Sequence, residues 1–431
     1  MRVCFYTLGC KVNLNETGAL EQMFRGAGFT IVPEGEEADV FVVNSCTVTN
    51  FGDQKSRKWL RRAKRENPGA VTVLTGCYPQ AFPEEAANFM EADLVCGNGD
   101  RKAILDNVLK LLDGHERIVA VTPHQRGELF EELPVERFET HTRAFIKVED
   151  GCNRQCAYCV IPRARGPVRS RAEESILAEL HQLAAAGYRE VVLSAISLPS
   201  YGLDTGTNLV ELVEKCAQVE GIERIRLGSL DPDMLTPEFI TRLAAVDKLC
   251  PQFHLSLQSG CTATLRRMRR VYTAEQYAKV VADLRAAYGE RPVSFTTDCI
   301  CGFPGETAAD FEESCAFLKE IGFLKVHVFP YSRRSGTPAY DFPDQVHERE
   351  KQDRSRKMNA LAEDIRREVL KGYEGMEDEV LLETPLSETL FTGYTRLYVP
   401  VVVSAPGHKS GEIVRVRLGE YDGERVRAAL C

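Results

Sequence analysis

The sequence predicts an α/β protein whose chain forms three successive domains. Strand-like and helix-like segments alternate along the first 113 residues and again from residue 143, and the pattern changes to short β-rich runs after residue 376. The chain has 431 residues, and its 44% of apolar residues is enough to build buried cores. We expect a domain at 1–113, a linker at 114–142, a second domain at 143–375 and a third at 376–431.

The first domain is expected to be a parallel, doubly wound α/β fold. Its apolar runs predict strands, and amphipathic stretches that fit helices separate them. The predicted strands are 3–8, 39–44, 71–75 and 93–95. Strands that alternate with helices in this way form a parallel sheet covered on both faces.

Three cysteines of the first domain each follow a predicted strand: Cys10, Cys46 and Cys77. The carboxyl ends of parallel strands meet at one edge of a sheet, where ligands gather. We therefore expect these three thiols to converge on a metal site, whereas core cysteines would lie within strands, as we expect for Cys4. Cys96 also follows a strand, so spacing alone leaves it as a rival ligand.

The second domain is expected to be a partial barrel of six strand-helix units. The predicted strands are 144–148, 190–196, 224–228, 254–258, 293–301 and 325–329. Six right-handed units make an open version of the eight-stranded α/β barrel, whose active sites lie at the carboxyl face. Before this domain, the charged segment 114–142 has no sustained apolar period and predicts a linker. After it, short runs at 379–383, 397–403 and 413–417 predict a small β-barrel.

Cys152, Cys156 and Cys159 follow the first strand of the partial barrel in a C-x3-C-x2-C run. Closed metal sites take four protein ligands, and catalytic sites keep one position open. A four-iron cluster held by three cysteines leaves one iron free to bind a small chelating ligand, so the spacing favours a catalytic iron-sulfur site. The alternatives are a zinc site whose fourth ligand lies elsewhere, or three unrelated core cysteines.

Composition indicates a protein of a reducing compartment, and we expect a cytoplasmic one without membrane association. The chain carries 15 cysteines, with no signal-peptide pattern and no apolar stretch of about 20 residues. The net charge of −9 argues against a uniformly basic nucleic-acid binder. Local basic patches must therefore carry any contact with RNA.

Two basic runs are candidates for that contact. Residues 55–65 place seven cations, among them Lys55 and Lys58, around Trp59, the single tryptophan of the chain. Such a helix fits phosphate binding and base stacking, or equally a solvated face anchored by the tryptophan. The second run follows the fourth barrel strand, near the expected mouth of the active site, and predicts phosphate contacts: Arg266, Arg267, Arg269 and Arg270.

Ordered motifs along nearly the whole chain resemble those of the radical S-adenosylmethionine methylthiotransferases. They are residues 7–13 (TLGCKVN), 43–48 (VNSCTV), 75–78 (TGCY), 147–171, 254–260 (HLSLQSG), 302–307 (GFPGET) and 329–332 (FPYS). The first motif, with Lys11-Val12-Asn13, is similar to the MtaB type, which acts on N6-threonylcarbamoyladenosine at tRNA position 37. The C-terminal segment resembles the small RNA-binding TRAM barrel.

The resemblance implies two [4Fe-4S] clusters and S-adenosylmethionine. Cys152, Cys156 and Cys159 would hold the cluster that binds S-adenosylmethionine and cleaves it to a 5'-deoxyadenosyl radical. The first-domain cysteines would hold an auxiliary cluster, again with one open iron. Cofactor contacts are expected at Tyr158, Ser194, Ser229, Asp231, Gln258, Gly302 and Glu306. Two of these expected contacts have a competing interpretation. Ser194-Ala195 departs from the usual Thr-Gly of the family, which puts the contact of that loop in doubt. Gly302–Glu306 fits a tight strand-to-helix turn equally well.

The expected activity is transfer of a methylthio group to C2 of N6-threonylcarbamoyladenosine. The C2–H bond is neither acidic nor electrophilic, so proton transfer and nucleophilic attack cannot functionalise it. Radical chemistry supplied by a cofactor can. The implied partners are a tRNA anticodon stem-loop, an electron donor such as flavodoxin or ferredoxin, and a sulfur source. Alternative substrates are isopentenyladenosine at the same position or an aspartate of a ribosomal protein. The alternative from another class is a zinc-containing RNA-binding protein.

Overall fold

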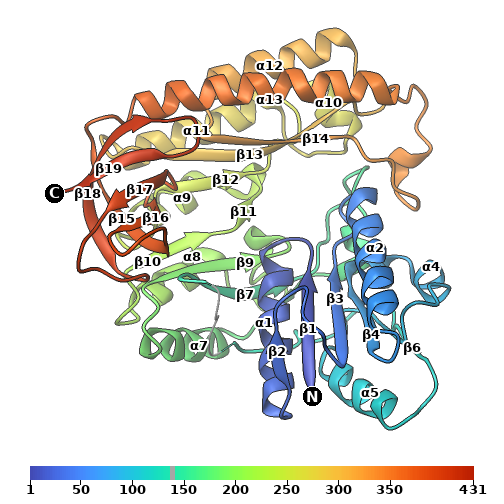
Figure 1. Ribbon diagram of the computed structural model, residues 1–431. Helices are drawn as coiled ribbons and strands as arrows, with labels where there is room; N and C mark the ends of the chain where they lie inside the picture. Colours follow the sequence, from blue (N-terminus) through green and yellow to red (C-terminus); the bar gives the residue numbers. More distant parts are fainter. Residues whose placement is uncertain (136–140) are drawn as a thin grey trace.

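The computed structural model describes residues 1–135 and 141–431 (Figure 1). Its N-terminal part is a six-stranded sheet of order β2-β1-β3-β4-β5-β6 in which every neighbouring pair is parallel. The strands are β1 (Arg2–Thr7), β2 (Thr30–Val32), β3 (Val40–Ser45), β4 (Val71–Gly76), β5 (Leu94–Cys96) and β6 (Ile118–Ala120). The chain order reverses between β1 and β3, which is where open sheets of this kind bind ligands.

Helices cover both faces of this sheet, as a doubly wound fold requires. Strands β3 and β4 are buried along their whole length, which is typical of parallel strands covered on both sides. Leu20 and Ile104 pack in the apolar cluster of one face, and Leu60 packs in that of the other. The helices are α1 (Lys11–Gly26), α2 (Asn50–Glu66), α3 (Cys77–Ala81), α4 (Pro83–Ala87) and α5 (Lys102–Leu112). The predicted fold of this part is confirmed.

The segment 114–142, predicted to be a linker, is partly built into this sheet. Strand β6 lies within it and pairs with β5. Farther along, Glu131 pairs with the guanidinium of Arg101 at 2.5 Å. Strand β6 has only three residues and lies in a charged segment without a sustained apolar period, which is why it was not predicted. Residues 136–140 of this segment lie outside the described residues.

The central part is the predicted open barrel, formed by two four-stranded sheets of order β10-β9-β7-β8 and β11-β12-β13-β14. Its strands are β7 (Ala144–Asp150), β8 (Arg169–Ser170), β9 (Glu190–Ala195), β10 (Arg224–Leu227), β11 (Ser229–Leu230), β12 (Gln252–Leu255), β13 (Ser294–Cys301) and β14 (Lys325–Pro330). The six predicted strands are present, and β8 and β11 add two short ones. An isolated bridge between Ile225 of β10 and Leu249, just before β12, connects the two sheets.

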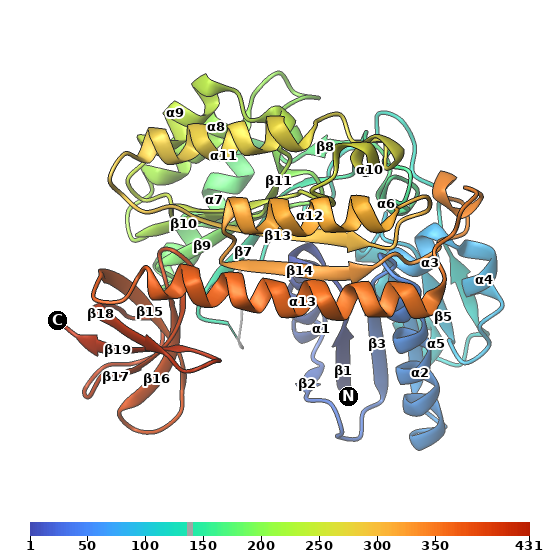
Figure 2. The same cartoon turned by 90° about the horizontal axis from the view of Figure 1, so that it is seen from above.

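Helices line the outside of this barrel, and Figure 2 shows α12 and α13 lying along β13 and β14. The α-helices are α6 (Ile161–Arg165), α7 (Glu173–Ala185), α8 (Leu209–Ala217), α9 (Pro237–Ala244), α10 (Thr262–Arg267), α11 (Ala274–Tyr288), α12 (Ala308–Ile321) and α13 (Glu348–Lys371). Short 3-10 helices are η1 (Leu198–Ser200), η2 (Pro232–Met234) and η3 (Pro338–Tyr340). In the described part of the chain, no helix is both long and apolar enough to span a bilayer.

The C-terminal part is a closed barrel of order β15-β16-β17-β19-β18. Its strands are β15 (Glu377–Pro385), β16 (Leu390–Thr395), β17 (Pro400–Ser404), β18 (Ile413–Tyr421) and β19 (Val426–Leu430). Burial alternates along β16, as expected when one face of a strand lines the core. This barrel docks on the central one, because Arg226 donates to the Thr395 carbonyl at 3.1 Å and Ser294 to the Leu397 carbonyl at 2.6 Å.

Candidate functional site

The structure brings Cys10, Cys46 and Cys77 together at one edge of the N-terminal sheet. They follow β1, β3 and β4, which are neighbours in the sheet. The loop of Cys10 lies against Cys46, since a Cβ added to Gly9 would lie 3.2 Å from the Cβ of Cys46. Cys10 is exposed, Cys46 half-buried and Cys77 buried. The rival Cys96 packs instead among apolar residues of the α1 and α5 face.

Hydrogen-bond donors surround two of these sulfurs. Arg165 Nε donates to the Cys77 Sγ at 3.2 Å, and the backbone N–H of Val48 donates to the Cys46 Sγ at 3.5 Å. The Arg165 guanidinium is fully buried. Hydrogen-bond donors of this kind stabilise a thiolate, and they tune the reduction potential of an iron-sulfur cluster that the thiolate ligates.

The second set, Cys152, Cys156 and Cys159, lies in the loop between β7 and α6. Gly151 starts this loop with φ +92°, and an added Cβ would lie 1.9 Å from the carbonyl oxygen of Pro167, so glycine is required there. The loop is tied to the barrel where Ala157 N donates to the Met268 carbonyl at 2.9 Å. Arg270 Nη1 donates to the Cys156 Sγ at 3.2 Å, so each cysteine set has one arginine on a sulfur.

Both sets include cysteines whose burial disfavours the free thiolate. Burial raises the pKa of Cys46 to about 12 and that of Cys152 to about 11, so binding to a cation is what would stabilise their thiolates.

The two sets are joined by a buried ionic cluster that sequence reasoning missed. Glu16 of α1 accepts from Arg165 Nη2 at 3.1 Å and pairs with Arg101 at 2.5 Å and with Lys147 at 2.9 Å. Burial alone would raise the pKa of Glu16, but the three cations lower it to about 2. Asp150, at the end of β7, pairs with Lys147 at 2.6 Å. The cluster thus fixes the N-terminal sheet against the first barrel strand.

Three of the expected cofactor contacts lie at the carboxyl ends of barrel strands. Ser194 is buried at the end of β9 and donates to the Ile146 carbonyl at 3.1 Å. Ser229, just after β10, is exposed. The backbone of Gln258, with φ +68°, donates to the Asp298 carbonyl at 2.9 Å and so extends the sheet toward β13.

The remaining expected contacts are held by neighbouring side chains. Asp231 pairs with Arg154 at 3.1 Å and also with Arg270, the donor to Cys156. The Tyr158 ring packs edge-on against Phe303, with centroids 6.5 Å apart.

Gly302 and Glu306 close a turn on each other. The Gly302 N–H donates to Glu306 Oε1 at 2.8 Å, and the Glu306 carboxylate pairs with Arg354 at 2.5 Å. Gly302 itself has φ +72°. These contacts favour the tight-turn interpretation of this segment.

The two basic runs divide into exposed and internal residues. Lys55 and Lys58 are exposed on α2, whereas Trp59 anchors the helix by stacking on Tyr6 with ring centroids 4.7 Å apart. In the second run, Arg266 and Arg269 are exposed.

The other two arginines of that run have internal partners. Arg267 pairs with Asp310 at 2.8 Å, and Arg270 points inward to Cys156 and Asp231. The position of Arg270 does not favour a phosphate contact.

A cavity of about 600 Å³ lies where the three parts of the chain meet. Cys10 and Lys11 line it from the N-terminal part, Ser194 and Ser229 from the barrel, and Tyr398 from the terminal barrel. It is therefore open to one cysteine set and to residues at the carboxyl ends of barrel strands.

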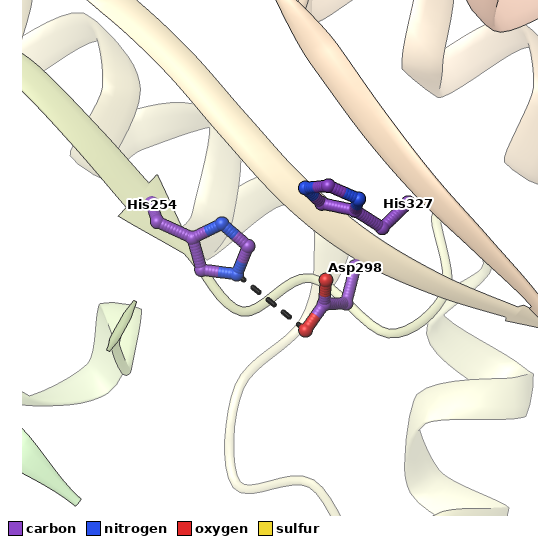
Figure 3. Close-up of side chains that lie close together, drawn as sticks. All are labelled: His254, Asp298 and His327. Carbon is purple, nitrogen blue, oxygen red and sulfur yellow. Dashed lines mark ion pairs between the residues drawn. The ribbon is translucent and has the colours of Figure 1, made fainter. Parts of the chain in front are cut away.

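A group of three ionisable side chains on the wall of this cavity was also missed. His254 on β12, Asp298 on β13 and His327 on β14 point toward one another (Figure 3), and their ligand atoms lie within 4.8 Å. Asp298 and His327 are register partners, and His254 Nε2 lies 3.5 Å from Asp298 Oδ2. Each is an ionisable residue within a predicted strand, which is the signal that the sequence offered.

Comparisons with known proteins match both halves of this arrangement. The family model described as "Uncharacterized protein family UPF0004" matches residues 2–97, and that of the radical SAM superfamily matches residues 146–318. The Threonylcarbamoyladenosine tRNA methylthiotransferase MtaB of Bacillus subtilis (strain 168) is 40% identical, over 96% of this chain and 93% of its own. The tRNA-2-methylthio-N(6)-dimethylallyladenosine synthase of Carboxydothermus hydrogenoformans (strain ATCC BAA-161 / DSM 6008 / Z-2901) is 34% identical, over 96% of each chain.

Among solved structures, the fold is similar to that of the radical S-adenosylmethionine methyltransferase TsrM from Kitasatospora setae, with cobalamin and a [4Fe-4S] cluster bound. The TM-score is 0.58 and the identity 15%, over 78% of this chain and 73% of that one. At this identity, the likeness concerns the fold alone.

Proposed function

Because the chain belongs to the MtaB group of the radical S-adenosylmethionine methylthiotransferases, we propose that it transfers a methylthio group to C2 of N6-threonylcarbamoyladenosine at tRNA position 37. The observation that carries the proposal is the pair of three-thiol sets, each at the carboxyl edge of a parallel sheet. Three thiols leave a [4Fe-4S] cluster one iron for an added ligand. Two such sets fit a reaction that needs one site to generate a radical and another to supply sulfur.

A [4Fe-4S] cluster and S-adenosylmethionine are cofactors of the radical SAM superfamily. In this chain we assign that cluster to Cys152, Cys156 and Cys159, and a second one to Cys10, Cys46 and Cys77. When bound, these groups supply the one-electron chemistry that an unreactive C2–H bond demands. Burial of Cys156 and Cys77 supports the assignment, since reactive species must be kept from water.

The surrounding residues orient and shield both thiol sets. Arg270 bridges Cys156 to Asp231, which fixes the three-cysteine loop to the residues after β10. Ala157, which belongs to that loop, packs in one apolar cluster with Met268 and Phe303. This packing keeps solvent away from the side of the loop that faces the barrel.

The proposed substrate is a tRNA anticodon stem-loop, which would contact the exposed cations Lys55, Lys58, Arg266 and Arg269. Phosphate neutralisation by such residues gives salt-dependent affinity without sequence preference. The reaction also calls for an electron donor, such as flavodoxin or ferredoxin, and for a sulfur source. We place the protein in the cytoplasm on the strength of its tRNA substrate and its 15 cysteines.

The substrate is tested by mass spectrometry of tRNA nucleosides from a strain that lacks this chain. We expect 2-methylthio-N6-threonylcarbamoyladenosine to disappear while its unmethylthiolated precursor accumulates. Loss of the methylthio derivative of isopentenyladenosine instead would assign the chain to the substrate that the Carboxydothermus relative is named for. Loss of a methylthio group from a ribosomal-protein aspartate, with both methylthio nucleosides still present, would show that the substrate is a protein.

A further inference from the structure

The cavity where the three parts meet has an excess of positive charge. Lys11, Lys325 and Arg366 line it, and Asp298 is the single carboxylate among its described lining residues. That carboxylate already lies beside the imidazoles of His254 and His327 (Figure 3). The cavity therefore presents more cations than its own anion can balance.

Among the described residues, two of those cations have no carboxylate within ion-pair distance. Within residues 1–135 and 141–431, neither Lys11 nor Lys325 forms an ion pair, whereas Arg366 lies near Glu363. Both lysines are close enough to His327 to lower its pKa, together with burial, which is the larger cause. Lys11 is half-buried and Lys325 is exposed, so it is the ammonium of Lys11 that is costly to leave unpaired unless a ligand supplies the opposite charge.

Tyr398 of the terminal barrel also indicates that the cavity is electropositive. Burial alone would raise the pKa of its phenol, but Arg143, Lys11 and Arg226 lower it below the ordinary value. Its backbone has φ +64°, which a non-glycine residue rarely adopts and which persists where the surroundings require it, as in ligand sites. The terminal barrel thus contributes a fixed aromatic side chain to the electropositive wall.

We propose that this cavity binds a carboxylate carried on N6 of the substrate adenine, with Lys11 and Lys325 as its partners and as specificity-determining residues. The inference rests on the proposed function and deepens it. Lys11 directly follows Cys10, so a base whose N6 substituent is held by Lys11 lies beside the auxiliary cysteine set. His327 and Tyr398 offer further hydrogen bonds to polar atoms of the same substituent.

The charge also explains why an apolar N6 substituent would be rejected. A hydrocarbon chain in this cavity would exclude water from the half-buried ammonium of Lys11 and give it no partner. Sites built around polar contacts discriminate strongly against analogues that lack the matching group. A hydrogen bond to a charged group corresponds to about a 10- to 100-fold change in affinity, and that is the preference we expect.

The test compares two anticodon stem-loops that differ in the charge of the N6 substituent. One carries N6-threonylcarbamoyladenosine at position 37, and the other carries its methyl ester, which lacks the negative charge and is one methyl group larger. Dissociation constants and kcat/KM are measured with anaerobically reconstituted holoenzyme. Wild-type protein is expected to prefer the acid by at least about tenfold. Lys325→Gln and Lys11→Met are expected to reduce that preference to about twofold or less, through weaker binding of the acid.

Lys110→Met, on the exposed surface of α5, is the matched control and should keep the full preference. Lys11 adjoins Cys10, so iron content is measured for each variant, and Lys325→Gln, far in sequence from both cysteine sets, decides the question if Lys11→Met loses iron. Equal affinity of wild-type protein for acid and ester, or an unchanged preference in Lys325→Gln, would overturn the inference and leave the proposed function intact. A holoenzyme that cleaves S-adenosylmethionine but methylthiolates neither stem-loop would instead refute the proposed function.

Discussion

The guanidinium of Arg165 lies 3.2 Å from the sulfur of Cys77, although the two residues belong to different parts of the fold. Arg165 ends α6, the helix that follows the three-cysteine loop of the barrel, and Cys77 begins α3 of the N-terminal part. The same guanidinium pairs with Glu16 of α1. One side chain therefore sets the position of one cysteine set relative to the other.

Arg165→Gln is expected to make the auxiliary cluster harder to reduce. The substitution removes a positive charge and a hydrogen bond from Cys77, an interaction of about 1.5–3 kcal/mol with a charged acceptor. That corresponds to a reduction potential more negative by about 60–130 mV for one electron. Anaerobic redox titration followed by EPR measures it. Arg163→Gln, on the same helix but stacked over Phe82, is the control and should leave both potentials unchanged.

Cys10→Ala is expected to separate the two cluster functions. Iron content should fall from about eight to about four per chain, because one of two four-iron clusters is lost. Cleavage of S-adenosylmethionine should continue and methylthio transfer should stop. Cys96→Ala, in the apolar core beside α5, should keep all of its iron. A Cys10→Ala protein that still transfers sulfur at the normal rate would remove the auxiliary site from the mechanism.

Glu16→Gln is expected to loosen the contact between the N-terminal sheet and the barrel. It leaves Arg101, Arg165 and Lys147 with less counter-charge in a buried site. Breaking a buried ionic cluster from one side costs about 3–5 kcal/mol of unfolding free energy. Urea unfolding at neutral pH measures this cost.

Glu66→Gln is the control for that experiment. It removes an exposed partner of Arg62 on α2 and should change the unfolding free energy by less than about 1 kcal/mol. Equal midpoints for the two variants would show that Glu16 does not fix the interface.

The double variant Lys55→Ala/Lys58→Ala is expected to bind tRNA more weakly and with less salt dependence. Each lysine that neutralises a phosphate contributes about 0.7–0.9 to the slope of log affinity against log salt, so the slope should fall by about 1–2. Filter binding or fluorescence anisotropy over a salt series measures it. Lys102→Ala/Lys110→Ala removes two exposed lysines from α5, on the opposite face of the sheet, and should leave the slope unchanged.

Much of the candidate site followed from local rules of the sequence. Cys10, Cys46 and Cys77 were expected to meet because each follows a strand of one parallel sheet, and in the structure the strands that they follow are neighbours. The three-cysteine loop needed only its own spacing. In both cases, the position of a residue relative to its own strand is enough to place it.

The rest depends on how distant parts of the chain pack together. Arg165 and Glu16 are 149 positions apart, and nothing in either segment specifies the other as its partner. His254, Asp298 and His327 form a group only once the register of β12, β13 and β14 is known, as in the pairing of Asp298 with His327. A shift of one residue would turn these side chains to the other face of the sheet.

The most direct test of the account is Mössbauer and EPR spectroscopy of the anaerobically reconstituted wild-type protein, with and without added ligands. We expect two [4Fe-4S] clusters, about eight irons per chain, with S-adenosylmethionine changing the spectrum of one cluster and a small thiolate changing that of the other. Variants Cys156→Ala and Cys10→Ala assign each signal to its cysteine set. Two clusters that respond to neither ligand, or zinc in place of iron, would contradict the account.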